Sequence, residues 1–110
     1  MKSHIEVDAG ICGFHTTVLA SSPDDQNVSF EIASDCEKIR GIADALRAHG
    51  PVDAYAEVNP AGRSVVMGTA RAGLKGCCAG CAVPVGLFKG MQVAAGLALP
   101  KDICLKITQE

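Results

Sequence analysis

The sequence has no tryptophan, and aromatic side chains make up only 4% of its composition. A core cannot be built around large rings here and must come from aliphatic residues, because apolar types still account for 48% of the chain. The 12 glycines favour close packing of backbone against backbone. A chain of 110 residues supports one modest core, so we expect a single domain over residues 1–110.

A charge excess of either sign is also missing. The formal net charge is -2, the isoelectric point is near 5.9, and the lysines and arginines are scattered along the sequence rather than clustered. Proteins that bind nucleic acid carry a basic patch. We therefore expect no nucleic acid among the partners.

No apolar run is long enough to cross a membrane, so no membrane partner is expected. The most apolar segment, residues 84–99, has 16 residues with three internal glycines. An acidic side chain already appears within residues 1–6, before the apolar run that a signal peptide needs, which predicts a cytoplasmic protein.

In the reducing environment of the cytoplasm, six cysteines indicate metal binding or redox chemistry, whereas an oxidising compartment would favour three disulfides.

Hydrophobic periodicity predicts an α+β fold. Alternation of apolar and polar residues predicts four strands, at 4–9, 14–20, 28–33 and 103–107. Apolar residues at helical spacing predict three helices, at 34–49, 60–74 and 84–99. Residues 51–58 fit either a short edge strand or a helical turn. This order favours a two-layer domain in which an antiparallel sheet of about four strands, three N-terminal and one C-terminal, packs on about three helices.

The segment Cys78-Ala79-Gly80-Cys81 carries the strongest chemical signal. Thiols separated by two residues can both reach one tetrahedral metal ion. Pro84 is suited to the first turn of a helix, so both thiols are expected near a helix N-terminus, whose dipole favours thiolates. Such a pair is half of a four-ligand site.

Two further cysteines can complete that site. Cys12 lies on a turn flanked by glycines, and Cys36 falls in the first turn of a helix that a Ser34-x-x-Glu37 capping box is expected to begin. We therefore predict a four-thiolate site that binds zinc or an iron–sulfur cluster. Its ligands are Cys12, Cys36, Cys78 and Cys81.

Other readings of the cysteines stay open. Cys77 can replace Cys78 in a Cys-x-x-x-Cys arrangement or act as a resolving thiol, and Cys104 fits a small apolar residue of the last strand. Cys78 and Cys81 also fit a dithiol redox protein, although thioredoxin-like folds place such a pair after a first βαβ strand. A third possibility is a structural or interaction protein with incidental buried cysteines.

The chain resembles, along nearly its full length, a small uncharacterised family of archaeal and anaerobic bacterial proteins. The motifs that carry this resemblance are Ile-Cys-Gly-Phe at 11–14, Ser-Asp-Cys-Glu at 34–37, Cys-x-x-Cys-x-Val-Pro at 78–84 and Ala-Gly-Leu-Ala-Leu-Pro at 95–100. The resemblance supports the choice of the four cysteines, but it implies no particular activity. We expect a metal or cluster carrier, or an accessory subunit, that is not itself an enzyme and acts with a protein partner or as a homodimer.

Overall fold

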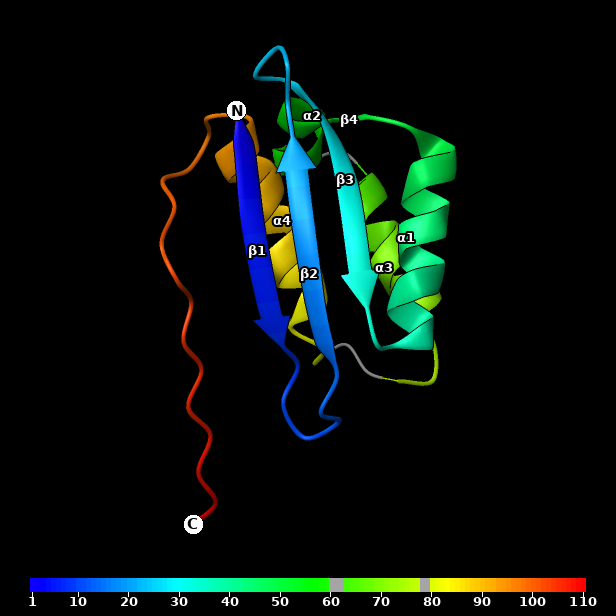
Figure 1. Ribbon diagram of the computed structural model, residues 1–110, viewed down its shortest axis with the longest axis vertical. Helices are drawn as coiled ribbons and strands as arrows, with labels where there is room; N and C mark the ends of the chain where they lie inside the picture. Colours follow the sequence, from blue (N-terminus) through cyan, green and yellow to red (C-terminus); the bar gives the residue numbers. More distant parts are fainter. Residues whose placement is uncertain (60–62, 78–79) are drawn as a thin grey trace.

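An antiparallel sheet forms one layer of the computed structural model, which describes residues 1–59, 63–77 and 80–110. In the described residues its order is β1-β2-β3-β4. The strands are β1 (Lys2–Asp8), β2 (His15–Ser21), β3 (Asn27–Ser34) and β4 (Val52–Asp53). The helices are α1 (Glu37–His49), α2 (Ala54–Val58), α3 (Val65–Gly73) and α4 (Val83–Ala94). They lie together on one face of the sheet (Figure 1), which confirms the predicted α+β class.

The fourth strand is not the one that the sequence predicts. β4 pairs with β3, with Val28 opposite Val52, whereas residues 103–107 form no strand. They belong to an extended, exposed segment, residues 99–110, which we call the tail. Alternation marks a segment as able to form a strand, but a strand also needs a hydrogen-bonded neighbour, and the tail has none among the described strands. The ambiguous residues 51–58 contain both predicted structures, β4 followed by α2.

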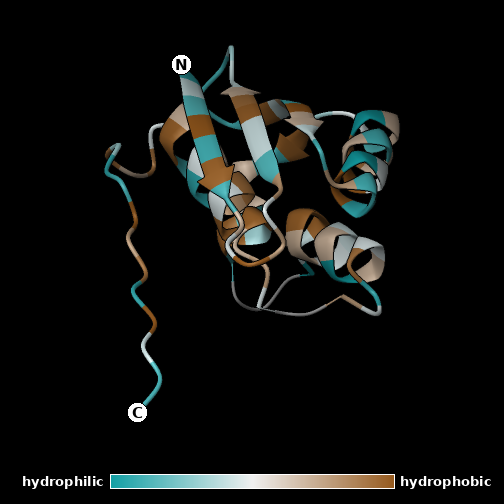
Figure 2. Ribbon diagram, turned by 60° about the horizontal axis from the view of Figure 1, so that its bottom comes forward, coloured by the Kyte–Doolittle hydropathy of each residue, from teal (hydrophilic) through white to brown (hydrophobic). Residues whose placement is uncertain are grey.

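The core lies between the sheet and the helices. On the sheet, alternate residues such as Val7, Val18 and Val28 face inward, as their period of two predicts. Figure 2 shows the alternation of hydrophobic and hydrophilic residues along β1. On the helices, the buried residues recur every three or four positions. They include Ile39, Ile42 and Leu46 of α1, Val66 and Ala70 of α3, and Leu87 and Met91 of α4.

Both α3 and α4 are shorter than predicted. α3 begins at Val65, where the buried Glu57 carboxylate accepts a hydrogen bond from the Val65 amide (2.7 Å) and another from the Ser64 hydroxyl. Residues 60–62 of the predicted helix lie outside the described residues. α4 ends at Ala94 because Gly96 adopts a positive φ of 76°, which suits a glycine that closes a helix.

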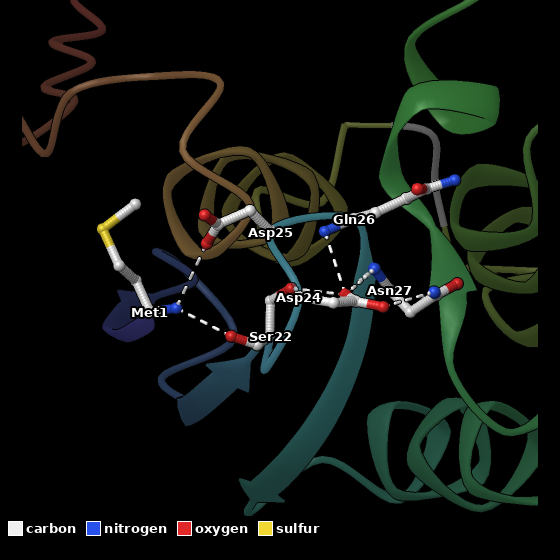
Figure 3. Close-up of polar contacts among 6 residues, drawn as sticks. All are labelled: Met1, Ser22, Asp24, Asp25, Gln26 and Asn27. Atoms are coloured by element: carbon white, nitrogen blue, oxygen red, sulfur yellow. Dashed lines mark hydrogen bonds and ion pairs between the residues drawn. The ribbon is translucent and has the colours of Figure 1, made fainter.

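The loop between β2 and β3 is organised by Asp24 (Figure 3). Its carboxylate accepts hydrogen bonds from the backbone N–H groups of Gln26 (3.1 Å) and Asn27 (2.8 Å) and from the Asn27 side chain (2.8 Å). The side-chain bond from Asn27 is the main reason that the pKa of Asp24 is lowered to about 2. The Met1 amine donates to the Ser22 carbonyl (2.7 Å), which ties the start of β1 to the same loop.

Two glycines of α3 should respond to alanine in opposite ways. A methyl group at Gly73 would overlap Cγ1 of the buried Ile42, so Gly73→Ala should lower the free energy of unfolding by about 1–3 kcal/mol. A methyl group at Gly68 meets open space, so Gly68→Ala should raise it by roughly 0.5–1 kcal/mol. Urea denaturation of both variants measures the difference. Equal shifts in the same direction would contradict this packing.

Acid should weaken the protein partly through Asp24. Its folded pKa lies below the ordinary value of 3.8, so its contribution to stability is complete above that pH and is lost as the pH falls toward 2. Asp24→Asn should therefore lower stability at pH 5 and flatten the decline between about pH 4 and 2. Asp44→Asn, at an exposed carboxylate on α1, is the matched control and should leave that decline in place. Urea denaturation midpoints of both variants and the wild-type chain, determined between about pH 5 and 2, measure this decline in stability.

Candidate thiol site

Four cysteines line a single hollow of about 310 Å³ at the lower end of the molecule in Figure 1. Three chain segments meet there: the turn between β1 and β2, the start of α1, and the connection from α3 to α4. The cysteines are Cys12, Cys36, Cys77 and Cys81. Residues that are distant in the sequence are thus brought to one place by the packing of the helices on the sheet.

Cys12 lies on the turn that joins β1 to β2. Gly10 and Gly13 adopt positive φ angles of 94° and 75°, which non-glycine residues rarely adopt, and the Gly13 amide donates to the Gly10 carbonyl (2.9 Å). The turn holds Cys12 outside the strands, where its side chain is exposed. The predicted glycine-flanked turn therefore exists, and its thiol is accessible.

Cys36 is the N-cap residue of α1, so the predicted capping box is wrong. Ser34 remains in β3, opposite Thr16, and the two hydroxyls hydrogen-bond across the strands (2.7 Å). The Ser34 oxygen also accepts from the Cys36 amide (3.1 Å), and no side chain caps the helix at Cys36. Because Ser34 is used between strands, the helix begins only at Glu37. The half-buried Cys36 side chain packs against the core at the positive end of the helix dipole.

Cys77 and Cys81 belong to the connection between α3 and α4. The Cys77 amide donates to the Leu74 carbonyl (2.8 Å), which continues the chain directly from the end of α3. The Lys38 ammonium donates to the Lys75 carbonyl (3.1 Å), so α1 fixes this connection from the other side. Cys77 is exposed, whereas Cys81 is half-buried and packs against the core.

A second hollow, of about 390 Å³, shares Cys77 and Cys81 with the first. Met67 and Arg71 of α3 and Val85 of α4 also line it. The two thiols therefore stand between two depressions of the surface. A basic residue lines each hollow, Arg71 the second and Lys38 the first.

The structure places three of the four predicted ligands, Cys12, Cys36 and Cys81, around the first hollow. Cys78 lies outside the described residues, and Cys77, the predicted substitute, lines the hollow. Within residues 1–59, 63–77 and 80–110, no group of three or more His, Cys, Asp or Glu side chains is compact enough to hold a metal ion. The thiols therefore surround a space without converging on a point.

Cys104 differs from its predicted place. The sequence predicts a small apolar residue of the last strand, but the side chain is exposed on the tail. It is well separated in sequence from the thiols of the hollow and does not line it.

None of the helices in the described part of the chain is long and apolar enough to span a bilayer.

A model of a family of unknown function, DUF6951, matches residues 3–107, from β1 to the tail. No curated protein and no solved structure matches the chain.

The bond network behind Cys36 gives a test of its position. Ser34→Ala removes the partner of both Thr16 and the Cys36 amide, so it should lower the free energy of unfolding by about 1 kcal/mol. Alkylation at Cys36, located by mass spectrometry, should become faster as the start of α1 loosens. Ser29→Ala, at an exposed position of the same strand, is the control and should change neither. An unchanged Cys36 rate in Ser34→Ala would show that the core alone positions this thiol.

Proposed function

Because the chain belongs to DUF6951, a family of unknown function, its role has to be argued from its residues, and we propose that it binds an iron–sulfur cluster or a zinc ion. The observation that carries this proposal is the hollow lined by Cys12, Cys36, Cys77 and Cys81. Thiolates are the soft ligands that both zinc and iron–sulfur clusters prefer. Four of them around one space is the number that either group uses.

Three ligands are assigned to separate segments of the fold. Cys12 comes from the β1–β2 turn, Cys36 from the start of α1, and Cys81 from the connection before α4. The fourth is Cys77 or Cys78. A group bound by these thiols ties together segments that the sequence separates widely. Binding should therefore stabilise the fold, because metal binding that depends on the folded arrangement adds to the free energy of folding.

The spread of the thiols favours a cluster over a single ion, because they line one hollow but no three of them converge on a point within the described residues. Around a lone zinc ion the four sulfurs must come within roughly 4 Å of each other, since each Zn–S bond is about 2.3 Å. A cluster of several iron and sulfide ions lets the thiolates stand further apart. Zinc would require a larger closure of the turn and the α3–α4 connection.

Binding would require the segments that carry the exposed thiols to move, and glycines beside these thiols leave their backbone with fewer steric limits. Cys12 lies on a turn with two glycines, and Cys77 follows Gly76, whose φ is 82°. Cys36 is anchored by α1 and the Ser34 bond, so it offers a fixed point. Two exposed ligands and one anchored ligand suit a carrier, because a partner's thiols can approach and replace the exposed ones. The proposed role is that of a carrier or accessory subunit.

Anaerobic reconstitution with ferrous iron and sulfide, or with zinc alone, tests the proposal. We expect about one cluster or ion per chain, protection of Cys12, Cys36 and Cys81 from alkylation, and a higher melting temperature when the group is bound. Cys36→Ser should lose the bound group, and Cys104→Ser is the matched control that should keep it. Comparing Cys77→Ser with Cys78→Ser identifies the fourth ligand.

One outcome would replace this function with another. Protein that retains neither iron, sulfide nor zinc, and that forms a readily reversible disulfide between Cys78 and Cys81, would be a dithiol redox protein. The same alkylation experiment detects it, because oxidation would then protect only those two thiols. Cys12 and Cys36 would react at the same rate before and after oxidation.

A further inference from the structure

The tail is apolar on alternate residues and yet exposed along its whole length. Ile103, Leu105 and Ile107 are 55%, 76% and 92% exposed. Figure 1 shows the tail leaving the end of α4, running apart from β1 and continuing past the end of that strand. In Figure 2 it carries the same alternation of hydrophobic and hydrophilic residues as β1. The tail therefore has the pattern of a half-buried strand but lies away from the sheet.

The tail lacks a hydrogen-bonded neighbour among the described strands, and the outer edge of β1 can provide one. Among the described strands β1 pairs only with β2, so its other edge presents unpaired backbone N–H and C=O groups. β1 contains no proline that would block pairing. It is also held firmly, since the Ser3 hydroxyl donates to the Gly90 carbonyl of α4 (2.7 Å). An open, rigid edge of this kind readily accepts another strand.

We propose that two copies of this chain form a symmetric dimer in which the tail of each adds to β1 of the other as an antiparallel strand. The tail is directed away from its own sheet and past the end of its own β1, which places it to meet a second molecule. Residues 99–107 of the tail also lie within the span that the family model matches. Because the exchange is reciprocal, each contact is made twice, which helps a short strand reach the roughly 1,200–2,000 Å² that stable interfaces bury.

One antiparallel register fits both faces of the added strand. With Ile107 opposite Ile5, Leu105 lies opposite Val7, so the apolar residues of the tail extend the face that α4 covers. The same register places Lys106 opposite Glu6, which is exposed on the other face of β1. Opposite charges and apolar pairs across neighbouring strands are stabilising, and a shift by one residue would reverse the faces.

A second charge pair supports this register. Glu110 lies opposite Lys2, which is exposed at the start of β1. The two ends of the paired segments thus carry complementary charges, and no pair in this register places like charges opposite each other. The tail and β1 are complementary in apolar pattern and in charge.

Sedimentation of the metal-free full chain measures the association directly, independently of the thiol site. We expect a dimer that dissociates on dilution. Leu105→Asp should abolish the dimer, because a carboxylate would replace an apolar residue on the buried face of the added strand. Thr108→Asp, on the opposite face of the same tail, is the matched control and should remain dimeric. Circular dichroism verifies that both variants stay folded. A monomeric wild-type chain, or a dimeric Leu105→Asp, would overturn the proposal.

Charge exchange distinguishes pairing between copies from pairing of the tail with its own β1. Glu6→Lys alone and Lys106→Glu alone should each weaken the dimer several-fold, because each places like charges opposite one another. Mixing the two variants should restore association as a heterodimer in which both pairs are again of opposite charge. Only pairing between different molecules gives that result. Equal affinities for the mixture and for the separate variants would show that the tail does not pair with β1 of a second copy.

Discussion

Close approach of helix backbones to aliphatic side chains, made possible by glycines, is the constraint on which the rest of the structure depends. Gly86 and Gly90 let α4 approach β1 so closely that a methyl group on either would overlap Val7 or Ile5. Gly73 does the same where α3 meets Ile42 of α1. A chain with 4% aromatic residues cannot fill a wide gap between layers, so it closes the gap. This spacing brings the start of α1, the β1–β2 turn and the α3–α4 connection to the same end.

The thiols of the hollow occupy the ends of these packed elements and none lies within one. Cys12 is on a turn, Cys36 occupies the position just before α1, and Cys77 and Cys81 lie in a connection. The elements fix where each of these segments begins. Under the proposed function, the bound group would be held by turns and connections and not by the packed core, so that a partner could take it over, as a carrier requires.

Local patterns of the sequence predicted what depends on local structure. Alternation identified β1, β2 and β3, and helical spacing identified the buried stripe of α1, because both follow from the geometry of a single segment. The capping box at Ser34 was wrong because a cross-strand partner, Thr16, takes its hydroxyl, and such a partner is invisible in a local motif. The lining of the hollow by Cys77 was likewise not decided by spacing, since its neighbour Cys78 carries the more familiar motif.

The tail shows most clearly why pattern alone does not determine structure. Its alternation is as regular as that of β1, yet one forms a strand and the other does not, because pairing depends on a neighbour and not on the segment itself. The same strand, β1, leads into the turn that carries Cys12 and presents the open edge. Adding a strand to that edge would hold β1 on both sides up to the turn. The added strand would thereby also fix the position from which the turn that carries Cys12 begins.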